Sequence, residues 1–199
     1  MKTRQREDTL FDVEAILAAD KYGVVGQDST LPWHHAGDFK RFKRLTMNHA
    51  LLMGVPTFIG LVKNFTKPGQ QVLPGRWIFV VGRPWSEDLT ADLGNVTRIA
   101  PDAPKYNLEK CRDILMPHQK LFICGGARIY RDYLDYAEQV HFTLMHKYHQ
   151  RDLATVNLQP KSMNLLGYNG LHEGWREVTY EGSEEDNGLK ASYYTMTVN

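Results

Sequence analysis

One acid, Asp38, lies on the apolar side of a helix that the sequence predicts over residues 36–47. At about 100° per residue, Phe42 and Leu45 fall within roughly 40° of Asp38 around this helix. The acid is either a first-turn residue that favours the helix dipole or a carboxylate half-buried in an apolar pocket. In the second interpretation desolvation raises its pKa, and its ligand is a cationic or amidine-like ring edge. The basic residues fall on the other side and are predicted to form a solvated face: Lys40, Arg41, Lys43 and Arg44.

A pair of glycines joins a predicted strand to a predicted helix in the segment FICGGARIY. Gly125 and Gly126 would let the backbone approach a ligand and leave helix N–H groups free for a phosphate. Arg128, in the first turn of that helix, could add a charge-assisted contact. Two more arginines follow turns, Arg76 in LPGR and Arg83 in VVGRP. The glycine pair alone also fits an ordinary tight turn, and each arginine alone also fits a solvated surface residue. The anion-binding and the purely structural interpretations therefore both stay open.

The elements that must position these residues alternate between strands and helices. Apolar runs predict buried strands at 13–19, 50–53, 77–82 and 120–124, and alternation predicts another at 138–146. Helices are predicted at 36–47, 55–62, 107–116 and after Gly126, with loops at 20–35, 62–72 and 86–105. The C-terminal segment predicts two strands joined by a loop that contains Asn187–Gly188. This order is typical of an α/β protein with a mostly parallel sheet and an antiparallel C-terminal edge.

Length and composition set limits on function. The 199 residues suit a single domain, 1–199, in which residues 1–12 are expected to be a solvated extension. A formal charge of +1 and the lack of a long apolar run favour neither a nucleic-acid nor a membrane partner. Cys111 and Cys124 fit a reducing, cytoplasmic compartment. The histidines show no ligand spacing, so we expect no metal, and the acidic segment 183–188 is predicted to be a solvated loop.

Six segments, in order and at compatible spacing, together resemble the dihydrofolate reductase family. They are LPW at 31–33, GDFKRFKRLT at 37–46, LLMGVPTF at 51–58, LPGR at 73–76, FICGGARIY at 122–130 and VHFTL at 140–144. The resemblance implies a three-layer fold, with an eight-stranded, mostly parallel sheet flanked by about four helices. It also implies NADPH-dependent reduction of 7,8-dihydrofolate to 5,6,7,8-tetrahydrofolate, by hydride transfer to pterin C6. A monomer that binds antifolates such as trimethoprim and methotrexate is expected.

The resemblance assigns a role to Asp38 and to its neighbours. Asp38 matches the acid that binds the pterin 2-amino group and N3 and promotes protonation of N5, and Thr143 matches the threonine that braces it. Leu31 and Trp33 match a loop that closes over the site, and Tyr130 matches the ring near the nicotinamide. The other implied substrate contacts are Ile16, Ala18, Phe39, Phe42, Leu61, Leu73 and Arg76, the last for the glutamate α-carboxylate.

The same resemblance implies a cofactor site. Its residues are Ala18, Val25, Gly54, Thr57, Arg83, Gly125, Gly126, Ala127, Arg128, Ile129 and Tyr130. Within it Arg83 matches a cation for the adenosine 2′-phosphate, which favours NADPH over NADH. The chain departs from the family where Val55–Pro56 replaces the usual basic residues, so Arg83 must act alone or with Lys63 or Lys67. It also departs at His35–Ala36, which places a titratable ring near the expected pocket mouth.

Two alternative functions keep the same fold. One is a pyrimidine reductase like those of the riboflavin pathway, although that group lacks the Leu-Pro-Trp loop and the acid-bearing helix as a pair. The other is a binding protein that holds folate and NADPH without turnover, which Val55–Pro56 and the long loop at 62–72 would favour. An assay of NADPH oxidation with dihydrofolate separates the three.

Overall fold

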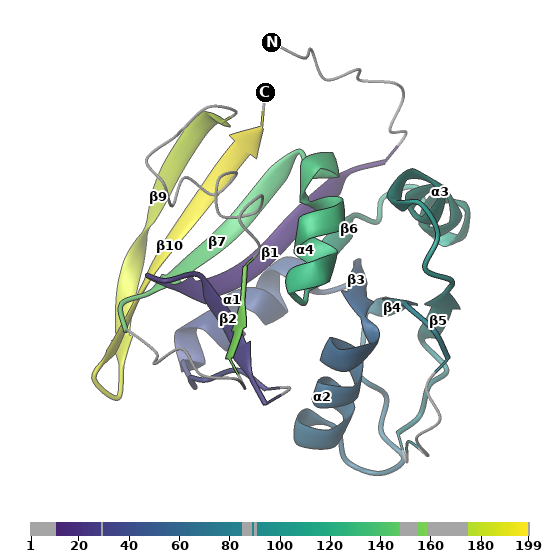
Figure 1. Cartoon of the computed structure of the whole chain (residues 1–199), viewed down its shortest axis with the longest axis horizontal. Helices are drawn as coiled ribbons and strands as arrows, with labels where there is room; N and C mark the ends of the chain where they lie inside the picture. The colour runs from purple at the N-terminus through teal and green to yellow at the C-terminus, as the bar shows by residue number, and fades with distance from the viewer. Residues whose placement is uncertain are drawn as a thin grey trace.

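The computed structural model describes residues 11–28, 30–84, 89, 91–147, 155–158 and 175–198. Its main element is an eight-stranded sheet in the order β5-β4-β3-β6-β1-β7-β10-β9 (Figure 1). The strands are β1 Val13–Asp20, β3 Ala50–Gly54, β4 Trp77–Val81, β5 Val96–Ile99, β6 Leu121–Gly125, β7 Gln139–Met145, β9 Trp175–Asp186 and β10 Leu189–Val198. The pairings from β5 to β7 are parallel, and β10 pairs antiparallel with both β7 and β9. The mostly parallel sheet with an antiparallel C-terminal edge is thus confirmed.

Four α-helices among the described residues cover the two faces of this sheet. They are α1 Ala36–Thr46, α2 Val55–Phe65, α3 Pro104–Ile114 and α4 Ala127–Tyr133, the last followed by a 3-10 turn, η1 Leu134–Tyr136. Helices α1 and α2 pack on one face around Phe58 and Phe122, and α3 and α4 pack on the other around Phe79 and Tyr133. Figure 1 shows α4 and α1 on opposite sides of β1. The three-layer arrangement is therefore as expected.

The central strand β1 contributes to both cores, which explains its nearly continuous apolar sequence. Val13, Ala15 and Leu17 face the core under α3 and α4, whereas Ile16 faces the core under α1 and α2. A strand buried on both faces has no solvent side to mark with polar residues. The exception is Glu14, which is buried on the side of the sheet that α1 covers.

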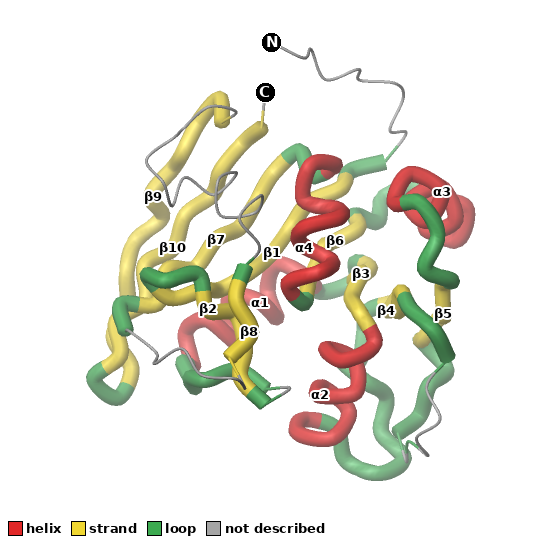
Figure 2. The backbone as a smooth tube through the Cα atoms, viewed as in Figure 1, coloured by secondary structure: helices red, strands yellow, loops and turns green. Residues whose placement is uncertain are grey.

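Several elements differ from the sequence-based expectations. The predicted loop at 20–35 contains β2 Val24–Gln27, which pairs with β8 Thr155–Asn157 in a separate two-stranded sheet (Figure 2). The loop-rich stretch 86–105 contains β5. Helix α3 begins three residues early because Pro104 occupies its first turn, a favourable position for proline. Helix α2 continues to Phe65, so the long loop begins at Thr66 rather than at residue 62.

The prediction of a solvated loop at 183–188 is wrong. Residues up to Asp186 continue strand β9, and only Asn187 and Gly188, both with positive φ, form the turn into β10. Asp186 Oδ2 accepts the backbone N–H of Ala36, the first residue of α1, at 2.7 Å. The predicted N-terminal extension lies mostly outside the described residues, apart from Asp12 and Phe11, which packs against the core.

Candidate active site

A large cavity of about 1300 Å³ opens at the carboxyl ends of β1, β3, β4 and β6. This is where open α/β sheets place their ligands, since the loops that follow the strands diverge there. Most of the residues predicted for the site line the cavity. They are Ile16, Ala18, Val25, Leu31, Asp38, Phe39, Phe42, Gly54, Thr57, Leu61, Leu73, Arg83, Gly126, Ala127, Arg128, Ile129 and Tyr130.

Helix α1 carries Asp38 into this cavity because its N-terminus is fixed by the His35 cap and by Asp186 of β9, which accepts the Ala36 N–H. His35 is the N-cap, and its Nδ1 accepts the backbone N–H of Asp38 at 3.2 Å. The imidazole is thus the N-cap acceptor, a role that Ser, Asp or Asn side chains usually fill at this position. His35 is fully buried, so the expectation of a titratable ring at the pocket mouth is wrong. The capping contact fixes the direction in which the first turn, and Asp38 with it, points.

The electrostatic setting of Asp38 is mixed. Burial raises the pKa of its carboxyl group, and a side-chain hydrogen bond with Thr143 and the positive charge of Arg41 oppose that rise. Thr143 is buried on β7, where it pairs with Ala18 of β1, so the sheet register places it beside the pocket floor. The result is a carboxylate with one fixed hydrogen-bond partner and apolar surroundings, consistent with the pocket interpretation of Asp38.

The turn after β6 brings the backbone close to two side chains. Gly125 has φ +103°, and a Cβ atom there would lie 2.9 Å from the Tyr130 ring. A Cβ atom on Gly126 would lie 3.1 Å from Thr57 Oγ1. The space that glycine leaves is filled by Tyr130, whose hydroxyl donates to the Ile16 carbonyl at 3.1 Å. Burial raises the pKa of Tyr130 well above its ordinary value, so this phenol stays neutral and remains a donor.

Two helices begin at the end of the cavity away from Asp38. The N-caps of α2 and α4 are Gly54 and Gly126, and neither provides a side-chain cap. First-turn N–H groups that lack a cap are donors for an anion. Exposed arginines stand nearby: Arg83 lines the cavity, and Arg128 lies 3.7 Å from Asp132. This end of the cavity therefore suits a phosphorylated group, and the opposite end suits a flat, nitrogen-rich ring.

Four predicted site residues do not line the cavity: Trp33, Arg76, Gly125 and Thr143. Trp33 is buried in a small cluster with Tyr193 behind the Leu31 segment. Arg76 is buried and donates to the carbonyls of Leu73 and Pro74 at 3.2 and 3.0 Å. Its contact with a substrate carboxylate stays a prediction. Lys63 and Lys67, the candidate helpers of Arg83, also lie outside the cavity lining.

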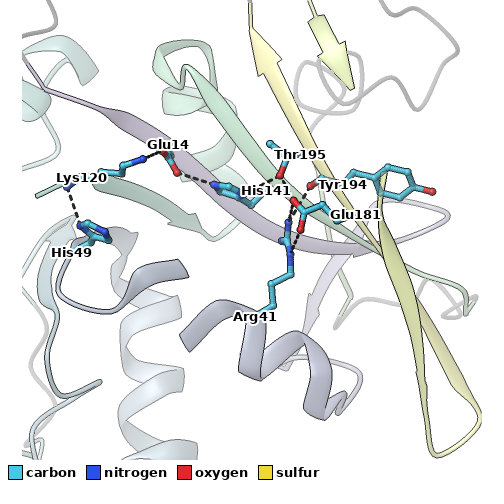
Figure 3. A network of polar contacts seen from close by, with 8 residues as sticks. All are labelled: Glu14, Arg41, His49, Lys120, His141, Glu181, Tyr194 and Thr195. Atoms are coloured by element: carbon cyan, nitrogen blue, oxygen red, sulfur yellow. Dashed lines mark hydrogen bonds and ion pairs between the residues drawn. The ribbon is translucent and has the colours of Figure 1, made fainter. Parts of the chain in front are cut away.

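The prediction that all four basic residues of α1 are solvated is wrong for Arg41. Its side chain is buried, and Nη2 lies 2.9 Å from Oε1 of Glu181 on β9 (Figure 3). Lys40, Lys43 and Arg44 are exposed as expected. The partner of Arg41 could not be predicted from local sequence, because Glu181 lies 140 residues away in the chain and falls in the segment where the sequence indicates only a strand.

Other cavity residues were missed for a similar reason. Phe65 lies on the turn of α2 that the sequence did not predict, and its ring centroid is 6.1 Å from that of Phe39. Gln27 and Val156 come from the β2–β8 pair. Periodicity over four residues is too short to identify such strands.

Within the described ranges, no three His, Cys, Asp or Glu side chains are grouped closely enough to hold a metal ion. Among the helices that the structure describes, none combines the length and apolar character needed to cross a membrane.

Comparison with known proteins gives a consistent result. The family model described as dihydrofolate reductase matches residues 12–186. The dihydrofolate reductase of Bacillus subtilis is 30% identical over 135 residues, which cover 67% of this chain and 69% of that protein. The dihydrofolate reductase of Staphylococcus haemolyticus is 26% identical over 184 residues, 92% of each chain.

A solved structure extends the likeness to the fold. Dihydrofolate reductase from Enterococcus faecalis, in complex with NADP(H) and RAB-propyl, superposes with a TM-score of 0.68 at 22% identity. The match covers 94% of this chain and 96% of that one. At this level of identity the superposition shows the shared fold.

Proposed function

The chain belongs to the dihydrofolate reductase family, and we propose that Asp38 is the group through which it reduces 7,8-dihydrofolate to 5,6,7,8-tetrahydrofolate with NADPH. The observation that carries the assignment of Asp38 is its place in the cavity. Among the described residues, Asp38 is the one carboxylate in the apolar part of the wall. The surrounding wall residues are Ile16, Ala18, Phe39, Phe42, Leu61 and Leu73.

The ring-binding end of the cavity explains the chemistry proposed for Asp38. An ionised carboxylate can accept two parallel hydrogen bonds, which fits the 2-amino group and N3 of a pterin. Phe42 and Leu61 line the same cavity and would enclose a flat ring. In such apolar surroundings a negative charge favours protonation of the ring, and N5 is the atom that must gain a proton. Leu31, at the rim, would exclude water when the ring is bound.

The anion-binding end fits the cofactor. NADPH supplies the hydride that reaches C6 of the pterin. The uncapped N-termini of α2 and α4 would hold its pyrophosphate, and Arg83 would meet the 2′-phosphate. Gly126 supports this fit, because its missing side chain leaves the backbone open beside Thr57. Tyr130, held by Ile16, would border the nicotinamide.

Finer properties follow from the same site. A protonated diaminopyrimidine carries the amidine edge that pairs with a carboxylate, so methotrexate and trimethoprim should bind at Asp38. We also propose that the protein acts as a monomer in the cytoplasm, where its two free cysteines would stay reduced.

The decisive experiment measures NADPH oxidation by the purified protein with dihydrofolate, for the wild type and for Asp38→Asn. We expect the variant to lose at least about 100-fold in turnover at neutral pH, because a positioned acid–base group typically contributes 10²–10⁴-fold. Part of the activity should return at low pH, where the solvent protonates the ring. Asp113→Asn, an exposed acid on α3, is the matched control.

Two outcomes would contradict the proposal. Unchanged turnover in Asp38→Asn would remove this acid from the mechanism. Tight binding of NADPH and methotrexate by the wild type without any turnover would favour the non-catalytic alternative.

A further inference from the structure

We propose that Arg41, held in place by Glu181, is a positioning residue for Asp38 in this reaction. The inference rests on the proposed function, because it assigns a role to a residue that acts through Asp38. Arg41 does not line the cavity, so it touches neither substrate nor cofactor directly. It lies three residues after Asp38 on α1, and residues with this spacing are neighbours on a helix surface.

The contacts of Arg41 fix both its position and its charge. Nη2 donates to Glu181 Oε1 at 2.9 Å, and Nε donates to Oε2 of the same carboxylate at 3.3 Å. Nη2 also donates to the Tyr194 carbonyl at 3.2 Å. A planar guanidinium held by a carboxylate fork in this way has little freedom to rotate. Arg41 therefore ties α1 to the two antiparallel strands at the edge of the sheet.

A second connection runs from Arg41 back to the acid. The Arg41 guanidinium carbon lies 5.5 Å from the centroid of the Tyr193 ring, within the range of a cation–π contact. Tyr193 pairs with Thr143 in the β7–β10 register, and Thr143 is the hydrogen-bond partner of Asp38. The helix and the threonine that brace Asp38 are thus both attached to the same cation.

Glu181 is itself fixed from the sheet side (Figure 3). Thr195 donates to Glu181 Oε1, and His141 Nδ1 lies 3.2 Å from the Thr195 oxygen. His141 Nε2 lies 2.8 Å from Oε2 of Glu14. Since Glu181 is held by these contacts, replacing Arg41 would leave the carboxylate near its present place. This allows the two charges of the pair to be removed one at a time.

Arg41 and Glu181 carry opposite charges, so removing one or the other should shift the pKa of Asp38 in opposite directions. Burial raises the pKa of Asp38, and the positive charge of Arg41 is one of the influences that lower it again. Removing Arg41 should therefore move the pKa of Asp38 upward, and removing the Glu181 charge should move it downward, because the cation is then no longer offset. A contact with a merely structural role would not give two shifts of opposite direction.

Other ionisable groups face Asp38 and stay unchanged in this comparison. His35 precedes it on α1, and Tyr130 of α4 and Tyr193 of β10 each interact electrostatically with it. Glu184 of β9 lies near Gly37 and accepts the Tyr193 hydroxyl at 3.4 Å. Asp186 binds the Ala36 N–H at the start of the helix. These groups are present in the wild type and in every variant of the test, so they do not account for differences between them in the pKa of Asp38.

The test measures the dissociation constant of methotrexate as a function of pH for the wild type, Arg41→Met, Glu181→Gln and Arg41→Lys. Methotrexate binds as a cation on a carboxylate, so its affinity falls on the acid side once Asp38 of the free protein takes up a proton. We call the pH range in which the affinity falls the acid limb. We expect the acid limb to lie about one pH unit higher in Arg41→Met, so that binding within that range is about tenfold weaker than in the wild type. It should move to lower pH in Glu181→Gln and stay near the wild-type position in Arg41→Lys.

Two controls separate this effect from damage to the fold. Arg44→Met makes the same change on an exposed position of the same helix, where solvent screens the charge, and should leave the limb in place. The double variant Arg41→Met/Glu181→Leu removes both charges together and leaves no unpaired buried ion. It should fold like the wild type, with its acid limb closer to the wild-type position than that of Arg41→Met.

The outcomes are distinguishable from failure of the proposed function. If the wild type binds methotrexate with an acid limb and the limb is the same in Arg41→Met and Glu181→Gln, or moves the same way in both, the role of Arg41 is refuted. If the wild type shows no such binding and no dihydrofolate turnover, the proposed function itself fails.

Discussion

A carboxylate among apolar side chains is energetically unfavourable, because burial disfavours its ionised form. Asp38 is placed in this way, and two groups favour its ionised form: Thr143 and Arg41. They come from a strand and from the same helix. The balance leaves Asp38 with a raised pKa, which suits a group that must hold a ring and favour its protonation.

Arg83 is the residue whose replacement should change the choice of cofactor. Among the described residues it forms no ion pair, and Val55 and Pro56 at the start of α2 offer no other cation. We expect Arg83→Ala to raise KM for NADPH tenfold or more, since a charged hydrogen bond is worth about 1.5–3 kcal/mol, and to leave KM for NADH unchanged. Steady-state kinetics with both cofactors would measure this.

The control for this prediction is Arg112→Ala. Arg112 is a partly exposed arginine on α3, outside the cavity, and lies 3.2 Å from Asp113. An equal change in KM for NADPH and NADH in Arg83→Ala would mean that Arg83 does not meet the 2′-phosphate.

Local sequence identifies some of these residues and cannot identify others. Asp38 was predicted because a helix repeats every 3.6 residues, so an acid on the apolar side is visible within one turn. Arg41 belongs to the same basic run as Lys40 and Arg44, but its i+3 spacing from Asp38 places it beside the apolar side of the helix, and it alone of the three is buried. Its partner, Glu181, lies on a strand at the far edge of the sheet. Such a contact depends on topology and leaves no trace in nearby residues.

At the scale of elements, the turn from β6 into α4 depends on glycine at a single position. We expect Gly125→Ala to lower the free energy of unfolding by about 3 kcal/mol, because the residue would combine a positive φ with a Cβ atom 2.9 Å from the Tyr130 ring. This corresponds to a fall in melting temperature of roughly 6–12 °C for a protein of this size. NADPH should also bind more weakly, since Tyr130 must move. Thermal unfolding and a cofactor titration would measure both effects.

Gly69→Ala separates the two causes. Gly69 has φ +72°, but a Cβ atom there would have no neighbour within 4 Å. It should therefore show only the cost of the left-handed conformation, about 1–2 kcal/mol, with unchanged cofactor binding. Equal destabilisation in the two variants would mean that the Tyr130 ring moves away from the new Cβ atom without a measurable loss of stability.

The predictability of the elements followed their length and their boundary residues. Buried strands such as β1 and β6 appeared as long apolar runs, and α2 was found because Pro56 marks its first turn. The four-residue strands β2 and β5 were missed. Strands this short are stabilised by pairing with distant segments rather than by their own pattern.

At the scale of the whole molecule, a chain of polar side chains crosses the sheet beneath α1, buried at Glu14, His141 and Arg41 and partly exposed at Lys120 and Glu181 (Figure 3). It runs from Lys120 on one side, through Glu14 and His141, to Glu181 and Arg41 on the other. Glu14 lies between the Lys120 ammonium and the His141 ring, and Glu181 lies between the Thr195 hydroxyl and the Arg41 guanidinium.

Glu14→Gln tests whether this chain stabilises the sheet. Burial acts to raise the pKa of Glu14, but the hydrogen bonds and charges of His141 and Lys120 outweigh it and lower the pKa below the ordinary 4.5. A lowered pKa in the folded state means that ionised Glu14 stabilises the protein above pH 4.5, and that this contribution is lost as the pH falls through the folded-state value. At pH 7, Glu14→Gln should therefore cost about 1–3 kcal/mol, because Lys120 and His141 lose the carboxylate that they share.

Denaturant unfolding of the wild type and Glu14→Gln at several pH values would measure this difference. We expect the two curves to separate fully between pH 6 and 8 and to converge as the pH falls below about 4. Glu177→Gln, an exposed acid on β9, should follow the wild type throughout. A constant difference between wild type and Glu14→Gln at every pH would assign the loss to packing. In that case the ionised form of Glu14 would not be what stabilises this polar chain.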